Sequence, residues 1–199
     1  VLVFVAGMPM RFVKWLAAGG VAVVITAYFT YSVARERIDI FLFGQGDAFQ
    51  VERAHATLSA SGWIGTGPFA GTAKFRLPEA QTDYIFSVIG EEFGLVTCAA
   101  IVMLFLAIIV RVLTRLREER DQFVILAGTG LIAQFGGQAM INMAVNTQLA
   151  PSKGMTLPFI SYGGSSLIAL AFAMGLLLAL TRRNPYLARP QAVTGWELR

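Results

Sequence analysis

The charged residues that could carry out chemistry gather in residues 62–92, where a polar loop meets an apolar run. Asp83 is the last charged residue before Tyr84, so we expect its carboxylate at a membrane–water boundary. Partial burial there raises the pKa of a carboxyl group toward that of a useful general base. Asp is also favoured as an N-cap, which would stabilise the anion instead and makes Asp83 a candidate ligand for a divalent cation such as Mg²⁺ or Mn²⁺.

Three basic residues have the right chemistry to stabilise a phosphate or diphosphate. Lys74 and Arg76 follow a loop with four glycines, and Lys153 is the basic residue of a short loop further on. Ammonium and guanidinium groups stabilise the charge of a departing phosphate. The glycines either form a flexible turn or let the backbone approach a phosphate closely. They do not form a P-loop, because the Gly-Lys-Ser/Thr of that motif is absent. Lys153 is equally explained as a side chain that extends from a helix end to the membrane surface.

Polar side chains within the apolar runs form another candidate set. Gln134, Gln138 and Asn142 recur every four residues and therefore share one helix face. They line either a groove that faces a substrate or a contact in which helices exchange hydrogen bonds. Glu91 lies on the same helix face as Asp83, and it either lines this groove or anchors the bundle through buried hydrogen bonds.

The elements that must position these residues are apolar helices. The chain of 199 residues is 56% hydrophobic and 14% charged, whereas a soluble domain is about a quarter charged. The apolar runs long enough to span a bilayer are Trp15–Val33, Tyr84–Val110, Phe123–Val145 and Phe159–Leu180. Residues 1–6 are apolar but too short, so we interpret them as the end of a further helix and the chain as part of a larger protein. The sequence predicts an all-α, polytopic transmembrane bundle with about four full spans plus the end of a fifth, in one membrane domain over residues 1–199.

The basic residues predict the orientation of this bundle. Arg11 and Lys14, the arginines of residues 111–120, and those of 182–189 all fall on one side if the four spans alternate. By the positive-inside rule that side is cytoplasmic, with residues 181–199 as a cytoplasmic tail and residues 34–83 as a large extracytoplasmic loop. The net charge of +4 therefore reports topology and not nucleic-acid binding. A single cysteine and a single histidine leave no His/Cys metal cluster and no internal disulfide.

Two stretches resemble signature motifs of the SEDS family, which includes FtsW, RodA and SpoVE, and their form is nearest to FtsW. They are LPEAQTDYIFSVIGEEFG at Leu77–Gly94 and PSKGMTLPFISYGGSS at Pro151–Ser166, with RIDIF at Arg37–Phe41 as a supporting match. The resemblance implies a peptidoglycan glycosyltransferase that polymerises lipid II into glycan strands during cell division. It also implies a place in the bacterial cytoplasmic membrane at the septum, an extracytoplasmic active face, a class B penicillin-binding protein as transpeptidase partner, and other division proteins.

The resemblance assigns roles to individual residues. Asp83 matches the essential acidic residue of the family, and Lys153 matches its basic residue before the second motif. It implies that the polar and glycine positions of that motif contact the substrate or its diphosphate, namely Ser161, Gly163, Gly164 and Ser165. Gln81 stands where many relatives have a histidine, so a titrating side chain is not supplied at that position.

Two other functions fit the same residues. A flippase for lipid II would also place polar stripes and acids within the membrane, although it needs polar lining through the full bilayer depth. A non-catalytic division scaffold would only hold the transpeptidase. The enzyme is favoured because the charged residues concentrate on one outer face.

Overall fold

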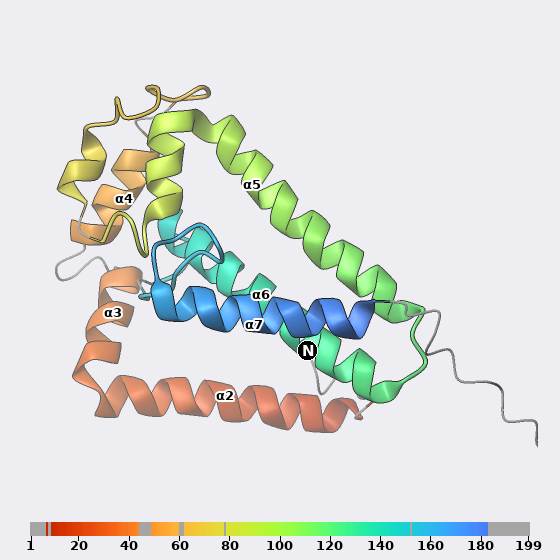
Figure 1. Ribbon diagram of the computed structural model, residues 1–199. Helices are drawn as coiled ribbons and strands as arrows, with labels where there is room; N and C mark the ends of the chain where they lie inside the picture. Colours follow the sequence, from red (N-terminus) through yellow and green to blue (C-terminus); the bar gives the residue numbers. More distant parts are fainter. Residues whose placement is uncertain are drawn as a thin grey trace, which may run out of the picture.

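All regular structure in the described part of the chain is helical (Figure 1). The computed structural model describes residues 7, 9–43, 49–59, 62–77, 79–151 and 153–182. In chain order the elements are α2 (Met10–Thr30), α3 (Ser32–Phe43), α4 (Phe49–Ser59), the 3₁₀ helix η1 (Ala73–Arg76), α5 (Ile85–Arg117), α6 (Gln122–Asn146) and α7 (Gly164–Thr181).

Of the described helices, α2, α5, α6 and α7 are long and apolar enough to cross a membrane. The expected all-α bundle with four spans is therefore confirmed. Residues 1–6, which we assigned to a further span, and residues 183–199 of the expected tail lie outside the described residues.

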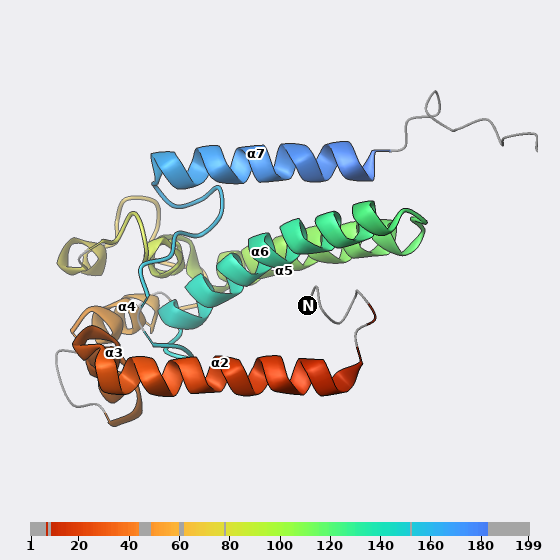
Figure 2. The same cartoon turned by 90° about the horizontal axis from the view of Figure 1, so that it is seen from below.

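Helices α5 and α6 form the centre of the bundle, antiparallel and side by side, and α7 lies along them (Figures 1 and 2). Phe105 of α5 and Phe135 of α6 pack with ring centroids 5.3 Å apart. Leu170 and Leu177 of α7 complete the buried apolar cluster. Lipid tails are as apolar as these side chains, so close packing and buried polar contacts must hold such helices together.

Helix α2 lies apart from this centre. Among the described elements it contacts only α3, and none of its residues is buried. Tyr31 adopts an extended conformation that ends α2, and the hydroxyl of Tyr28 donates to Asp39 of α3 across the resulting corner at 2.8 Å. We had treated residues 34–43 as loop. Their charges obscured the helical pattern, yet Arg35 and Asp39 form an ion pair four residues apart, as in a helix.

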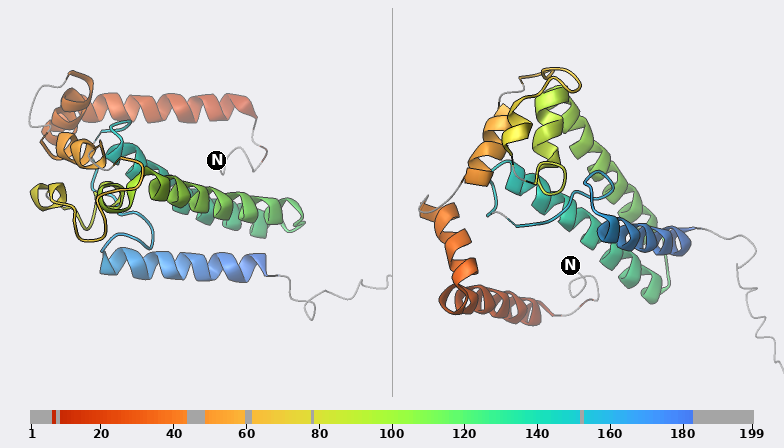
Figure 3. Two further views of the ribbon diagram at one scale, coloured as in Figure 1. Left: turned by 90° about the horizontal axis from the view of Figure 1, so that it is seen from above. Right: turned by 60° about the vertical axis from the view of Figure 1, so that its left-hand side comes forward.

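The polar segments collect at one end of the bundle. Figure 3 shows α3, α4 and the loop with η1 at the end where α5 and α7 begin and α6 finishes. The start of α2, the α5–α6 connection and the end of α7 lie at the opposite end, with the basic residues. Within α4, Ala54 and Leu58 are buried and His55 is exposed, as the helical spacing in residues 49–60 predicts.

The helix ends differ from the expected spans for local reasons. Helix α2 starts before Arg11 and Lys14 and not after them, because long basic side chains can extend from a helix to the membrane surface. Helix α5 continues seven residues beyond the expected end at Val110, to Arg117, for the same reason. Helix α7 begins at Gly164 instead of Phe159 because residues 158–160 form a turn.

Candidate active site

The site rests on a break in α5 at Gly94, where the helix changes direction (Figure 1). Gly94 has φ 82° and ψ 173°, so the backbone hydrogen bonds of the helix cannot continue across it. Residues 62–67 fill the break and satisfy the freed groups on both sides. The hydrogen bonds are Leu95 N–H to Gly62 O at 3.2 Å, Val96 N–H to Trp63 O at 3.3 Å, Thr66 N–H to Glu91 O at 2.9 Å and Gly67 N–H to Glu92 O at 3.0 Å.

Only glycine fits where this loop crosses the helix. A Cβ at Gly94 would lie 2.3 Å from the carbonyl oxygen of Trp63, and one at Gly65 would lie 2.4 Å from that of Glu92. Both residues also have positive φ, which side chains disfavour. The amides of Thr66 and Gly67 donate hydrogen bonds to backbone carbonyl groups of α5. Because these amides are already engaged, they do not bind a phosphate.

Two adjacent carboxylates fasten the rest of the loop to α5. Glu91 is 2% exposed, and its carboxylate accepts hydrogen bonds from the backbone amides of Ala73 at 2.7 Å and Lys74 at 3.0 Å. Glu92 forms an ion pair with the ammonium of Lys74. Glu91 therefore anchors η1, which is the second of the two roles its position allowed. The ammonium of Lys74, predicted to bind diphosphate, is engaged by Glu92.

A tight turn presents Asp83. Glu79, with φ 57°, offers its carbonyl to the amides of Thr82 and Asp83 at 3.1 Å and of Tyr84 at 3.3 Å. The hydroxyl of Thr82 donates to the carboxylate of Glu79 at 2.7 Å. The N-cap of α5 is Tyr84, and no side chain caps the helix. The carboxylate of Asp83 is therefore not the N-cap that the sequence allowed.

The polar row of α6 fixes this turn through the backbone of Asp83. Asn142 donates to the carbonyl oxygen of Asp83 at 2.8 Å and to that of Met155 at 2.6 Å. Asn146 donates to the Asp83 carbonyl at 3.1 Å and accepts from the hydroxyl of Ser87 at 2.7 Å. The row thus joins α5, α6 and the loop after α6.

Gln134 and Gln138, which the sequence places on the same face of α6 as Asn142, differ in their contacts. Gln138 donates to the carbonyl oxygen of Thr156 at 2.9 Å, in the same loop after α6. Gln134 is exposed. The side-chain amides of Gln138 and Asn142 are thus hydrogen-bonded to backbone carbonyl groups. The groove that faces a substrate stays a prediction.

The second motif packs directly against the first. The amide of Tyr162 donates to the carbonyl oxygen of Gln81 at 2.9 Å. A Cβ at Gly154 would lie 3.1 Å from Oδ2 of Asp83, so this loop approaches the carboxylate closely because residue 154 has no side chain. The neighbouring Lys153 is exposed.

The remaining residues of the second motif prepare the start of α7. The hydroxyl of Ser161 accepts from the amide of Leu157 at 2.7 Å, which makes it a turn-forming residue. Gly163 is the N-cap of α7, and Gly164 and Ser165 are exposed in its first turn. Gly163 and Gly164 are thus placed at the outer end of the bundle, on the side where Asp83 lies.

Burial and two charged neighbours set the protonation of Asp83. Partial burial is the main influence and raises the pKa of its carboxyl group, and the carboxylate of Glu79 raises it further. The guanidinium of Arg37, from α3, lowers that pKa in part. The pKa of Tyr84 is raised by burial and by Asp83, and lowered in part by Arg37. We assigned no role to Arg37 or Glu79 from sequence, although both lie within or next to the matching motifs.

A pocket of about 460 Å³ opens beside this turn. It combines polar with apolar side chains, as an amphipathic substrate requires. Its lining residues are Lys74, Phe75, Leu77, Glu79, Ala80, Gln81, Ile85 and Val88. Arg76 is exposed on the adjoining η1.

The donor groups near the turn suit one kind of cation site. Within the described residues, no three His, Cys, Asp or Glu side chains are grouped to hold a metal ion. Asp83 and Glu79 supply two carboxylates. Mg²⁺ is commonly bound by one or two carboxylates together with substrate phosphates, so these residues fit such a site and do not fit a cage made by protein alone.

The fold and site define a polytopic helical membrane protein with a partly buried acid at one end of the bundle. A family model described as "Cell cycle protein", which covers FtsW, RodA and SpoVE, matches residues 1–186. The chain belongs to this family.

Two similar proteins share one name. A protein of Caulobacter vibrioides called "Probable peptidoglycan glycosyltransferase FtsW" is 39% identical over 183 residues, 92% of this chain and 47% of that protein. A protein of Trichlorobacter lovleyi with the same name is 37% identical over 188 residues, 91% of this chain and 49% of that one. The chain spans about half the length of the curated relatives it matches.

A solved structure shares the arrangement of helices. It is described as "Structural coordination of polymerization and crosslinking by a peptidoglycan synthase complex" and matches with a TM-score of 0.70 and 30% identity, over 92% of this chain and 52% of that chain. The bundle therefore has the fold of that chain.

Proposed function

We propose that the protein is a peptidoglycan glycosyltransferase that polymerises lipid II into glycan strands during bacterial cell division. The observation that carries this proposal is Asp83: its pKa is raised by burial, and Asn142 and Asn146 hold its backbone in place. A raised pKa makes the Asp83 carboxylate a stronger general base than an exposed aspartate. The family and the names of the relatives support the same activity.

In the proposed reaction, a sugar 4-hydroxyl of one substrate attacks the anomeric carbon of another. The hydroxyl proton passes to a carboxylate oxygen of Asp83 as the new C–O bond forms. The bond from the anomeric carbon to the lipid diphosphate breaks, and the diphosphate leaves with its electron pair. Configuration at the anomeric carbon inverts.

The departing diphosphate needs positive charge near Asp83. Arg76 and Lys153 are exposed, and Lys153 adjoins Gly154, which contacts Asp83. Arg37 acts electrostatically on Asp83 and is a further candidate. Lys74 is paired with Glu92, so its main role is to hold η1 in place. Its effect on the substrate is indirect, through the position of η1.

A divalent cation remains part of the proposal. Asp83 and Glu79 would hold it together with substrate phosphates, and it would neutralise charge on the leaving diphosphate. Activity should then fall on chelation and return with added Mg²⁺ or Mn²⁺.

The proposed setting is the bacterial cytoplasmic membrane at the division septum, with the Asp83 end outside. The four apolar helices and the positive-inside rule support this orientation. A class B penicillin-binding protein is the proposed partner because the similar solved structure is described as a complex of polymerization and crosslinking. Other division proteins are expected to join it.

The test is glycan-strand formation from labelled lipid II by the purified full-length protein with its partner. Asp83→Asn should lower the rate of polymer formation at least about 100-fold, because general-base catalysis contributes a factor of this size. Binding of lipid II should persist. Asp39→Asn is the matched control, because Asp39 pairs with Tyr28 of α2 and with Arg35 of α3. That variant should retain most activity.

The outcomes separate the three candidate functions. Unchanged polymer in Asp83→Asn would remove Asp83 from the chemistry. An inactive wild type that moves lipid II across liposomes would establish the flippase, and one that only recruits the transpeptidase would establish the scaffold. The amides of Gln138 and Asn142 are bonded within the protein, which leaves the flippase less of the polar lining it needs.

A further inference from the structure

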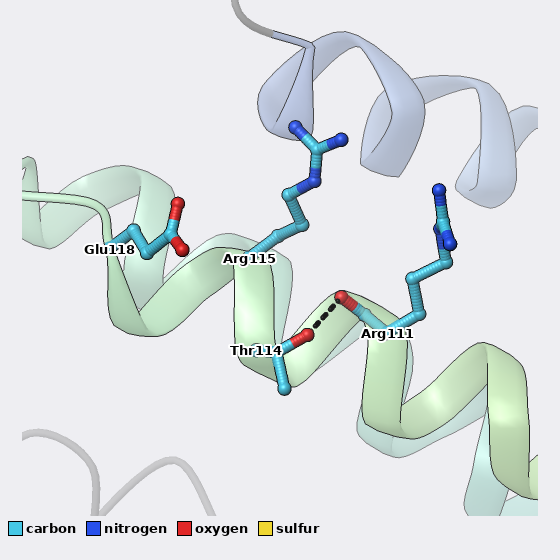
Figure 4. Close-up of a pocket in the computed structure, with 4 residues that line it drawn as sticks. All are labelled: Arg111, Thr114, Arg115 and Glu118. Carbon is cyan, nitrogen blue, oxygen red and sulfur yellow. Dashed lines mark hydrogen bonds between the residues drawn. The ribbon is translucent and has the colours of Figure 1, made fainter.

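A second pocket lies at the other end of the bundle, far from Asp83. Arg111, Thr114, Arg115 and Glu118 line a space of about 420 Å³ at the end of α5. Figure 4 shows Arg111 and Arg115 pointing the same way, toward the neighbouring α7. The hydroxyl of Thr114 donates to the carbonyl oxygen of Arg111 at 2.9 Å. Nothing in the proposed glycosyl transfer uses these residues.

The depth of the pocket matches the phosphate layer of a membrane. Beyond the break at Gly94, α5 continues without interruption from Leu95 to Arg117. From Leu95 to Arg115 the helix rises about 30 Å, which is the thickness of the hydrocarbon core. The two guanidinium groups therefore reach the headgroup level on the side that the positive-inside rule assigns to the cytoplasm.

The charges of the pocket suit a single phosphodiester. Neither guanidinium has an ion-pair partner within the described part of the chain. The two guanidinium groups of the lining suit the negative charge of a phosphodiester headgroup. Exposed apolar side chains nearby, Val110 at 50% and Leu178 at 67%, can contact acyl chains.

We propose that Arg111 and Arg115 bind the phosphate of an anionic phospholipid of the phosphatidylglycerol type, on the side of the bundle opposite Asp83. Arginine pairs with phosphate through two parallel N–H donors, and basic pockets between transmembrane helices are known to hold such headgroups.

The experiment is native mass spectrometry of the full-length protein, titrated in detergent with phosphatidylglycerol and, separately, with phosphatidylcholine. The wild type should retain one phosphatidylglycerol and little phosphatidylcholine. Arg111→Gln/Arg115→Gln should weaken binding about 25-fold, since each arginine near the surface contributes about a factor of five. Arg117→Gln/Arg120→Gln removes the same charge outside the pocket and should change binding less than about twofold.

Thermal unfolding of both double variants in the same detergent guards against an effect of misfolding, because their unfolding temperatures should equal that of the wild type. Equal losses in the two double variants would overturn the proposal in favour of diffuse attraction. So would equal retention of the two lipids by the wild type, or displacement of the lipid by millimolar inorganic phosphate or by a lipid-linked diphosphate.

Discussion

Two charged groups act on the carboxyl of Asp83. They are the negative charge of Glu79, four residues earlier in the same turn, and the positive charge of Arg37 on α3. Partial burial strengthens both influences because fewer waters screen them. The proton affinity of Asp83 is thus adjustable at two neighbouring positions without a change to the reacting group.

The first prediction concerns the acid limb of the pH–rate profile for glycan polymerisation. Asp83 accepts a proton only when ionised, so activity rises as pH increases through its pKa. Glu79→Gln removes a charge that raises this pKa, so the limb should move to lower pH. Arg37→Gln removes a charge that lowers it, so the limb should move to higher pH. Steady-state rates across pH measure both.

Shifts of the limb in the same direction in both variants would contradict this electrostatic account. Lys14→Gln is a suitable control, because Lys14 lies at the opposite end of α2 from α3. Its profile should coincide with that of the wild type.

A second prediction concerns the amide that positions Asp83. Asn142→Ala removes the hydrogen bonds to the carbonyl oxygens of Asp83 and Met155. Loss of positioning should lower kcat by about 10- to 100-fold with a smaller change in KM. Gln134→Ala is the matched control from the same helix face, and its exposed side chain predicts little effect. Equal kcat in the two variants would show that Asn142 does not position the site.

At the scale of elements, α5 works as two helices joined at Gly94. The first part, Ile85–Phe93, follows Asp83 and carries near its end the two carboxylates that fasten η1. The second part, Leu95–Arg117, belongs to a helix that is long and apolar enough to cross a membrane. Non-helical backbone at this depth is tolerated because residues 62–67 satisfy its polar groups.

The third prediction tests this junction. Gly94→Ala places a Cβ against the Trp63 carbonyl in a left-handed conformation, and should destabilise the protein by at least about 2 kcal/mol. Gly137→Ala is the control, since its Cβ meets no atom within 4 Å in a helix and should stabilise by about 0.5–1 kcal/mol. Thermal unfolding of the full-length protein in detergent measures both. A Gly94→Ala protein as stable as the wild type would refute the close approach.

At the scale of the whole molecule, polar and charged groups separate to the two ends of the bundle (Figures 2 and 3). One end holds the loops around Asp83, and the other holds the arginines of α5 and the connection to α6. The apolar sides of the spans between them are widely exposed, as lipid contact requires.

The fourth prediction fixes the orientation of this bundle in cells. A membrane-impermeant thiol reagent should label Ile64→Cys from outside intact spheroplasts, because Ile64 is 85% exposed beside the break in α5. Glu119→Cys, in the α5–α6 connection, should react only after permeabilisation. The native Cys98 is buried and should stay unlabelled. The reverse pattern would invert the proposed topology.

The sequence by itself determined the all-α class, the four spans and the two motifs that carry the candidate site. Long apolar runs and the loop distribution of charge are one-dimensional signals, so no contact was needed to read them. The break in α5 at Gly94 was not predicted from the sequence, because the crossing loop lies about 30 residues earlier in the chain. Helix α3 was missed because charged residues obscured its pattern.

Only the tertiary structure decided what each polar side chain does. It assigned Asn142 and Asn146 to the backbone of Asp83, Glu91 to η1, and Lys74 to Glu92. It also brought Arg37 and Gly154 to Asp83 from distant segments. An amide or carboxylate within an apolar helix must find a partner, but sequence spacing gives only its helix face, and packing in three dimensions selects the partner.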